Sequence, residues 1–70
     1  MMPLTMARSG ERNTIKRVTG QDEVRRHLAT LGFVVGEDVT VITEIGGNMI
    51  LSIKDSRIAL DKGMAQRILV

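Results

Sequence analysis

The clearest pattern of apolar and polar positions predicts a helix over residues 21–31. Its apolar positions follow the i, i+4, i+7 spacing that lines one helix face, at Val24, Leu28 and Leu31. Charged and polar residues occupy the opposite face, at Glu23, Arg26 and Thr30. The segment is therefore expected to be an amphipathic helix that buries one stripe against a core.

Both ends of this helix carry signals of their own. Thr19, with Asp22 three residues later, is typical of a capping box at the N-terminus. Gly32 is placed to adopt the left-handed conformation beyond the last helical residue, and Phe33 can then fold back onto Leu28. The N-terminal signal, the apolar face and the C-terminal signal all indicate the same helix.

The chain after the helix alternates as short strands do. One strand is expected over Asp38–Ile45, with one face formed by Val39, Val41, Thr43 and Ile45. The next run, residues 49–54, alternates a second apolar face at Met49, Leu51 and Ile53. Between them, Gly46-Gly47-Asn48 has the composition of a hairpin turn.

Shorter elements are expected toward both ends of the chain. A strand over Arg57–Leu60 would be buried through Ile58 and Leu60. A single helical turn over Asp61–Gln66 follows, weakened by Gly63. Three more strands are expected, over residues 68–70, 13–18 and 4–7.

Strands this short cannot build a large sandwich. A mainly β architecture is expected, a small and strongly curved antiparallel barrel that limits its exposed edges, with the helix plugging one end. The 70 residues suffice for a single domain, 1–70. A chain of this size buries only about 60% of its unfolded surface, so the barrel must use its apolar side chains efficiently.

Composition removes several classes of function. The chain has no cysteine, which excludes disulfides, iron–sulfur clusters, cysteine-based zinc sites and cysteine nucleophiles. Phe33 is the only aromatic residue, which counts against stacking of bases, prolines or sugars. The apolar fraction of 43%, mostly Val, Ile, Leu and Met, still indicates a folded protein.

The charge is less basic than the isoelectric point suggests. Ten basic and eight acidic residues give a net charge of +2, yet the isoelectric point is about 9.7. Few side chains titrate in the middle of the pH range, because there is one His and neither Cys nor Tyr, so the small positive charge persists to high pH. The isoelectric point alone therefore does not indicate nucleic-acid binding.

The sequence also bears on location. No run of about eighteen apolar residues is present, as a membrane-spanning helix requires. The first residues lack the long apolar core of a signal peptide. A cytoplasmic protein is expected.

The residues that could hold a metal are few. Glu23 and His27, four residues apart on the helix, could hold a borderline metal ion, but two ligands make only a weak site. An ordinary boundary role for His27 is the simpler interpretation. The five methionines are scattered and are better explained as core or surface filling. We expect no cofactor.

Catalytic motifs are missing as well. The pair Gly46-Gly47 is not followed by the Lys-Ser/Thr of a phosphate-binding loop, and a hairpin turn explains it. No nucleophile elbow or acid–base pair in a recognisable motif is present. The chain is not expected to be an enzyme.

Several segments together resemble the FeoA family of small ferrous iron transport proteins. They are Ser9–Glu11, Val24–Phe33, Gly36–Val41, Arg57–Leu60, Ala65 and Ile68–Val70. The most specific part is the helix that ends in Leu31-Gly32-Phe33 with Gly36 three residues later. Two departures, Asp55-Ser56 in place of a common Gly and Gly63 in place of a better helix former, leave the C-terminal face less defined.

The resemblance implies an SH3-like barrel and a role beside FeoB, the membrane ferrous iron transporter with a cytosolic GTP-binding domain. It would make this chain a non-catalytic cytosolic accessory that binds the transporter and regulates it, touching the membrane only through that partner. The same module is similar to the C-terminal domain of iron-dependent repressors, but we expect no DNA-binding domain before it in this protein.

Docking is expected to use aliphatic, Met and Arg side chains, because a proline-binding groove needs aromatic walls. The candidate contact residues are Leu4, Met6, Arg25, Arg26, Met49 and Met64. Two simpler roles stay open. Leu4 and Met6 could complete the barrel, and the two arginines could pair with Asp22 and Glu23 along the helix.

Two other functions are alternatives to this hypothesis, nucleic-acid binding and metal sensing. A small nucleic-acid-binding barrel would use the basic residues between Arg8 and Arg26 on phosphates and would weaken steeply with salt. A free-standing metal sensor would rest on His27. Short edge strands and a weak last helical turn would also permit strand-exchanged homodimers.

Overall fold

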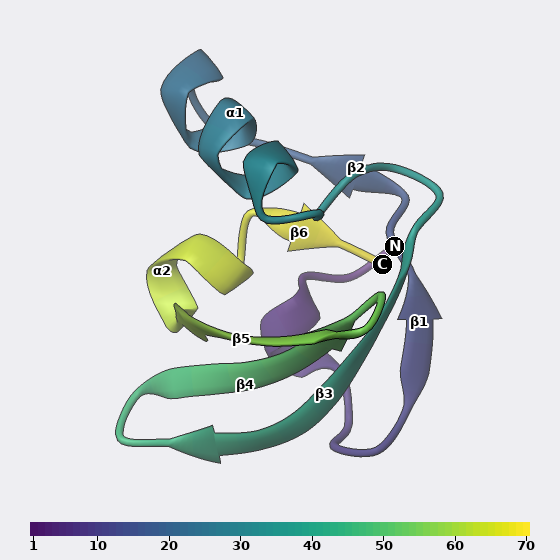
Figure 1. Ribbon diagram of the computed structural model, residues 1–70. Coiled ribbons are helices and arrows are strands. Elements are labelled where there is room, and N and C mark those ends of the chain that lie inside the picture. Colours follow the sequence, from purple (N-terminus) through teal and green to yellow (C-terminus); the bar gives the residue numbers. More distant parts are fainter.

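Two antiparallel sheets form most of the protein, which a computed structural model describes over residues 1–70 (Figure 1). A 3-10 turn η1 (Leu4–Met6) comes first. The elements after it are β1 (Arg12–Thr14), β2 (Arg17–Val18), α1 (Asp22–Thr30), β3 (Asp38–Ile45), β4 (Asn48–Ile53), β5 (Ser56–Asp61), α2 (Lys62–Ala65) and β6 (Ile68–Leu69). The larger sheet has the order β1-β3-β4-β5, and the smaller one pairs β2 with β6. The predicted mainly β fold with one principal helix is confirmed.

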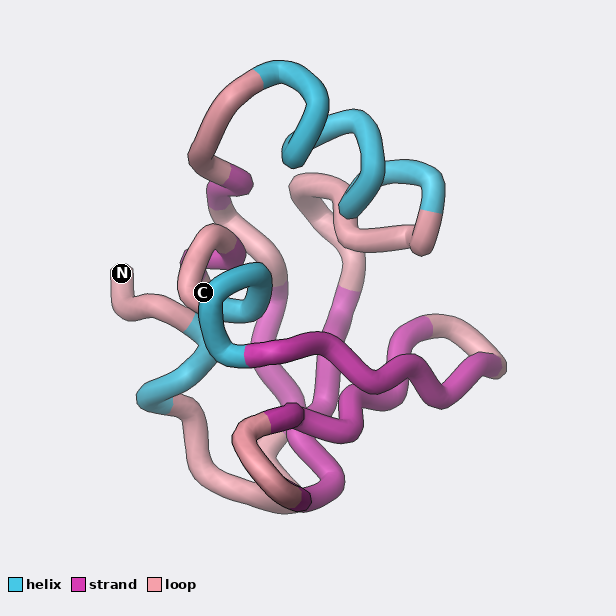
Figure 2. The backbone as a smooth tube through the Cα atoms, turned by 90° about the vertical axis from the view of Figure 1, so that its left-hand side faces the viewer, coloured by secondary structure: helices cyan, strands magenta, loops and turns pink.

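The core between the sheets is entirely apolar. Its thirteen buried residues include no polar side chain. Strand β4 shows the expected alternation, with Met49, Leu51 and Ile53 at 2% exposure or less. Helix α1 lies at one end of the molecule (Figure 2). Its Leu28 belongs to the core. Phe33, the one aromatic residue, is 1% exposed.

The C-terminal end of α1 forms as its sequence predicts. The Phe33 amide donates to the Leu28 carbonyl at 2.9 Å, and the Gly32 amide donates to the Ala29 carbonyl at 2.9 Å. These two bonds make a Schellman motif, with Gly32 at φ +105°. The motif turns the chain sharply and brings Phe33 back to the core beside Leu28.

The predicted capping box at the other end is wrong. Gln21 is the N-cap residue of α1, and no side chain caps the helix there. The Thr19 amide and hydroxyl instead both donate to the Arg67 carbonyl, at 2.8 and 3.3 Å. Thr19 is held by β-sheet pairing between β2 and the segment before β6, which moves it away from the helix.

A β-bulge in β3 changes which of its residues are buried. Val41 pairs with Leu51, but Thr43 pairs with Ile50, so one extra residue lies between them. The extra residue reverses the alternation beyond it. Thr43 and Ile45 are therefore exposed, although the sequence pattern predicted them on the buried face with Val41.

The strand predicted over residues 13–18 changes sheets midway. The Ile15 amide donates to the Glu37 carbonyl at 2.8 Å, next to β3. The Lys16 amide donates to the Leu69 carbonyl at 2.8 Å, next to β6. The chain therefore joins the two sheets at this point and is split into β1 and β2.

The strand predicted over residues 4–7 is also wrong. The Met6 amide donates to the Pro3 carbonyl and the Ala7 amide to the Leu4 carbonyl, at 2.9 and 3.0 Å, which closes the turn η1. This turn buries Leu4 completely while leaving Met6 exposed. Just before it, Met2 and Val70 exchange two backbone hydrogen bonds of 2.8 Å, so both ends of the chain lie side by side (Figure 1).

The predicted turn over residues 61–66 forms as α2. The Asp61 carboxylate caps it by accepting from the Met64 amide at 2.8 Å. The chain then returns as β6, antiparallel to β2. This return buries Ile68 in the core.

Burial corrects two of the six candidate contact residues. Leu4 is 0% exposed and Met49 is 1% exposed, and both belong to the core. A partner cannot reach either side chain. For Leu4, the simpler role of completing the barrel holds.

Replacing Gly32 or Gly36 by Ala tests the backbone at the end of α1. Both residues have a positive φ, +105° at Gly32 and +95° at Gly36. There is room for an added Cβ at both positions, because at Gly32 its nearest neighbour would be Ile53 at 3.9 Å and at Gly36 it would meet no atom within 4 Å. We expect each substitution to lower the free energy of unfolding by about 1–2 kcal/mol, because L-residues are strained there. Urea denaturation measures both. A several-fold greater loss at Gly32 would instead indicate crowding against Ile53.

Two Met→Ala substitutions test the assignment of core and surface. Met49→Ala should cost about 2–5 kcal/mol of unfolding free energy, since it leaves a cavity in the core. Met6→Ala removes the same atoms from a side chain that is 68% exposed, and it should stay within about 0.5 kcal/mol of the parent. Equal losses in thermal or urea unfolding would refute the burial of Met49.

Candidate functional site

Two candidate contact residues lie on neighbouring elements. Met6 projects from η1 and is 68% exposed. Met64 lies on α2, where it is half-buried against the core. Because α2 packs against η1, the structure brings the two elements together on one side of the barrel.

The two candidate arginines lie on α1 and differ in their pairing. Arg25 forms an ion pair with Asp22 one turn earlier, as the simpler interpretation of this residue expected. Arg26 is exposed and has no carboxylate within 4 Å. Of the pair, Arg26 is the one free to contact a partner's acidic group.

The two candidate metal ligands lie on the exposed side of the same helix. Glu23 and His27 are both exposed. Nowhere in the protein do three His, Cys, Asp or Glu side chains gather as a metal site would need. The donor set is thus limited to two groups on one helix face.

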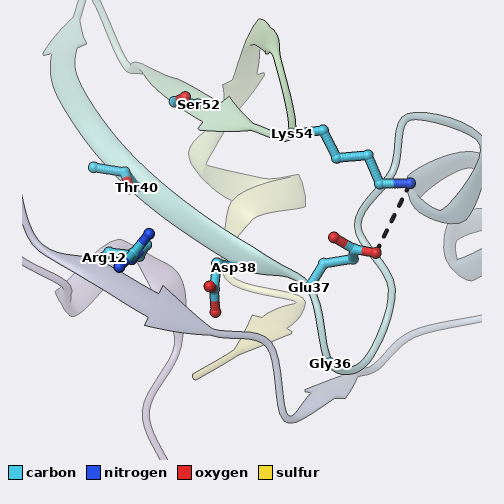
Figure 3. A pocket seen from close by; sticks show the side chains of 7 residues that line it. All are labelled: Arg12, Gly36, Glu37, Asp38, Thr40, Ser52 and Lys54. Carbon is cyan, nitrogen blue, oxygen red and sulfur yellow. Dashed lines mark ion pairs between the residues drawn. The ribbon is translucent and has the colours of Figure 1, made fainter.

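A polar pocket of about 390 Å³ lies on the outer face of the larger sheet (Figure 3). It is lined by Arg12, Gly36, Glu37, Asp38, Thr40, Ser52 and Lys54. Arg12 pairs with Thr40, and Thr40 pairs with Ser52, so these three form one row across β1, β3 and β4. No hydrophobic side chain lines the pocket.

The carboxylates of this pocket already have partners. Glu37 lies 3.8 Å from the Lys54 ammonium, and Asp38 accepts from the Thr14 hydroxyl at 2.8 Å. Arg12 has no ion pair. The groups left to hold a small polar ligand are thus the Arg12 guanidinium and the hydroxyls of Thr40 and Ser52.

This pocket could not be predicted from the sequence, because it requires three strands in register. A signal was present: Thr40 and Ser52 are the polar positions between buried residues of β3 and β4. Such alternation identifies an outward face but does not show that Arg12 stands beside it.

Other surface features bear on partners. Arg8, Lys16 and Arg17 are exposed, and none has a carboxylate within 4 Å. No helix in the structure has the length and apolar character needed to cross a membrane.

Comparison with solved structures supports the same fold. A crystal structure of an iron uptake regulatory protein, FeoA, superimposes with a TM-score of 0.87 at 25% identity, covering 94% of this chain and 89% of the other. FeoA of Stenotrophomonas maltophilia, crystallised with zinc and described as a prokaryotic SH3 domain protein, gives 0.84 at 27% identity, covering 99% and 88%. The fold is therefore the SH3-like barrel of FeoA proteins.

Sequence comparison agrees with the structures. A protein of Methanocaldococcus jannaschii named "Putative Fe(2+) transport protein A" is 33% identical over 70 residues, which cover all of this chain and 85% of the relative. The model of the FeoA domain matches residues 2–70. The chain belongs to the FeoA family.

Proposed function

We propose that the protein is a non-catalytic cytoplasmic accessory of ferrous iron uptake, which binds a FeoB-type transporter and regulates its GTP-binding domain. The observation that carries this proposal is the match to the FeoA domain over residues 2–70. The likeness to a named Fe(2+) transport protein over the whole chain supports it. The absence of catalytic sequence motifs favours a docking role.

The docking surface must differ from that of SH3 domains that bind proline-rich peptides. Such domains use aromatic side chains as groove walls, and here the only aromatic residue, Phe33, is buried. We assign the contact to Met6 on η1 and Met64 on the neighbouring α2, and to Arg26 with Arg25 on α1. An exposed Met adapts to irregular partner surfaces, and an unpaired Arg is a frequent interface anchor.

Binding to the transporter's isolated GTP-binding domain tests this assignment. Met6→Asp should weaken the affinity roughly tenfold or more if Met6 is an interface anchor. Val35→Asp is the matched control, because Val35 is 66% exposed and lies outside the proposed contact. Isothermal titration calorimetry measures both, with GTP hydrolysis as a second readout.

Two other results would contradict parts of this proposal. A loss with Val35→Asp alone would move the docking surface to the loop between α1 and β3. No binding by the parent protein to either the domain or the whole transporter would overturn the proposed function.

The alternative function is nucleic-acid binding through the unpaired basic residues. Recovery of protein partners from a lysate of the source organism, at low and moderate salt, separates the two hypotheses. Phosphate contacts weaken steeply with salt, whereas a packed protein interface is less sensitive. Recovery of nucleic acid without the transporter would favour the alternative.

The zinc seen with the relative from S. maltophilia raises the question of a metal site in this chain. The residues present do not fit one, because no three His, Cys, Asp or Glu side chains gather in the protein, and the pair Glu23 and His27 supplies only two exposed ligands. We expect His27→Ala to bind Zn²⁺ or Fe²⁺ as weakly as the parent protein in a calorimetric titration. A loss of tight binding on this substitution would instead support the metal-sensor hypothesis.

A further inference from the structure

The outer edge of β5 has no partner within the protein. In the larger sheet β5 is the last strand and pairs only with β4. No other backbone or side-chain hydrogen bond reaches its residues from Ser56 to Leu60. The strand has six residues, whereas β1 at the opposite edge has three. It contains no proline and has no register shift against β4, so two of the usual protections of an edge are missing.

The register shows which backbone groups point outward. The Lys62 amide donates to the Gly47 carbonyl at 3.3 Å, one step beyond the pair of Asn48 with Asp61. Bonded and non-bonded pairs alternate in an antiparallel ladder. Leu60, Ile58 and Ser56 therefore bond to β4. Arg57, Ala59 and Asp61 direct their amide and carbonyl groups away from it.

The side chains of these three residues share the outer face of the sheet. They stand opposite Ser52, Ile50 and Asn48, and all three are exposed. Arg57 has no carboxylate within 4 Å. The Asp61 carboxylate caps α2 by accepting from the Met64 amide, and it has no cation within 4 Å. Opposite charges thus lie two residues on either side of a small residue, Ala59.

This arrangement is complementary to itself. If a second β5 lies antiparallel to the first with a two-fold axis at Ala59, each Arg57 stands directly opposite Asp61 of the second copy. The outward backbone groups of the two strands then face one another as bonded pairs. On the inner face, Ile58 lies opposite Leu60 of the second copy and extends the apolar layer.

We propose that the β5 edge is a self-association surface through which two copies of this chain pair antiparallel about Ala59. The occupant is a second copy because its charges match at both ends of the pairing, as an isologous interface requires. The contact needs no exchange of strands. An edge of this length buries far less than the roughly 1,600 Å² of a standard stable interface, so the dimer is weak and reversible.

Cysteine cross-linking tests the pairing, because the parent chain has no cysteine. In a bonded antiparallel pair the two Cα atoms are about 5.5 Å apart, within the range a disulfide spans. Ala59→Cys should therefore form a covalent dimer in a glutathione redox buffer. Thr43→Cys is the matched control, since Thr43 is exposed on β3 away from this edge. Non-reducing electrophoresis measures the dimer fraction, and a urea midpoint confirms that each variant is folded.

A second substitution tests the register. Adding Arg57→Asp to Ala59→Cys places like charges opposite each other at both ends of the pairing. The dimerisation constant, obtained from the dimer fraction at equilibrium, should then fall roughly tenfold. Equal cross-linking of the Ala59→Cys and Thr43→Cys proteins would overturn the proposal. Cross-linking that Arg57→Asp does not reduce would overturn the pairing about Ala59. Because no transporter is present, either result leaves the proposed function untouched.

Discussion

The fold depends on the burial of thirteen apolar side chains between a four-stranded sheet and a two-stranded sheet that is too small to be stable alone. Ile15 is central to this arrangement because the chain leaves the larger sheet there and enters the smaller one. Its amide bonds to the segment before β3, while the next amide bonds to β6. Without that crossing, β2 and β6 would have no core to cover, and α1 would have no base on which to lie.

Because the core is entirely apolar, all polar chemistry lies at the surface. All buried side chains are apolar and no buried polar side-chain atom lacks a partner, so chemistry and recognition are confined to the outside of the barrel. There the polar pocket, the unpaired Arg26 and the exposed Met6 lie on different elements. The candidate contact groups are therefore spread over several elements of the barrel.

The elements that could be predicted from sequence are those with local causes. Helix α1 and its end at Gly32 follow from apolar spacing and from a conformation that glycine adopts easily. The buried face of β4 follows from strict alternation. The exposure of the candidate docking residues could not be predicted in this way. A methionine fits the same sequence pattern whether its side chain is 1% exposed, like Met49, or 68% exposed, like Met6.

The sequence by itself determined the fold class, the family and the C-terminal end of the main helix, since spacing and turn residues act over a few neighbouring positions. Only the tertiary structure decided the bulge after Val41, the turn that buries Leu4 and the row of Arg12, Thr40 and Ser52. It also left the edge of β5 unpaired. These features depend on which strand lies beside which and in what register, and that is set by the packing of residues far apart in the chain.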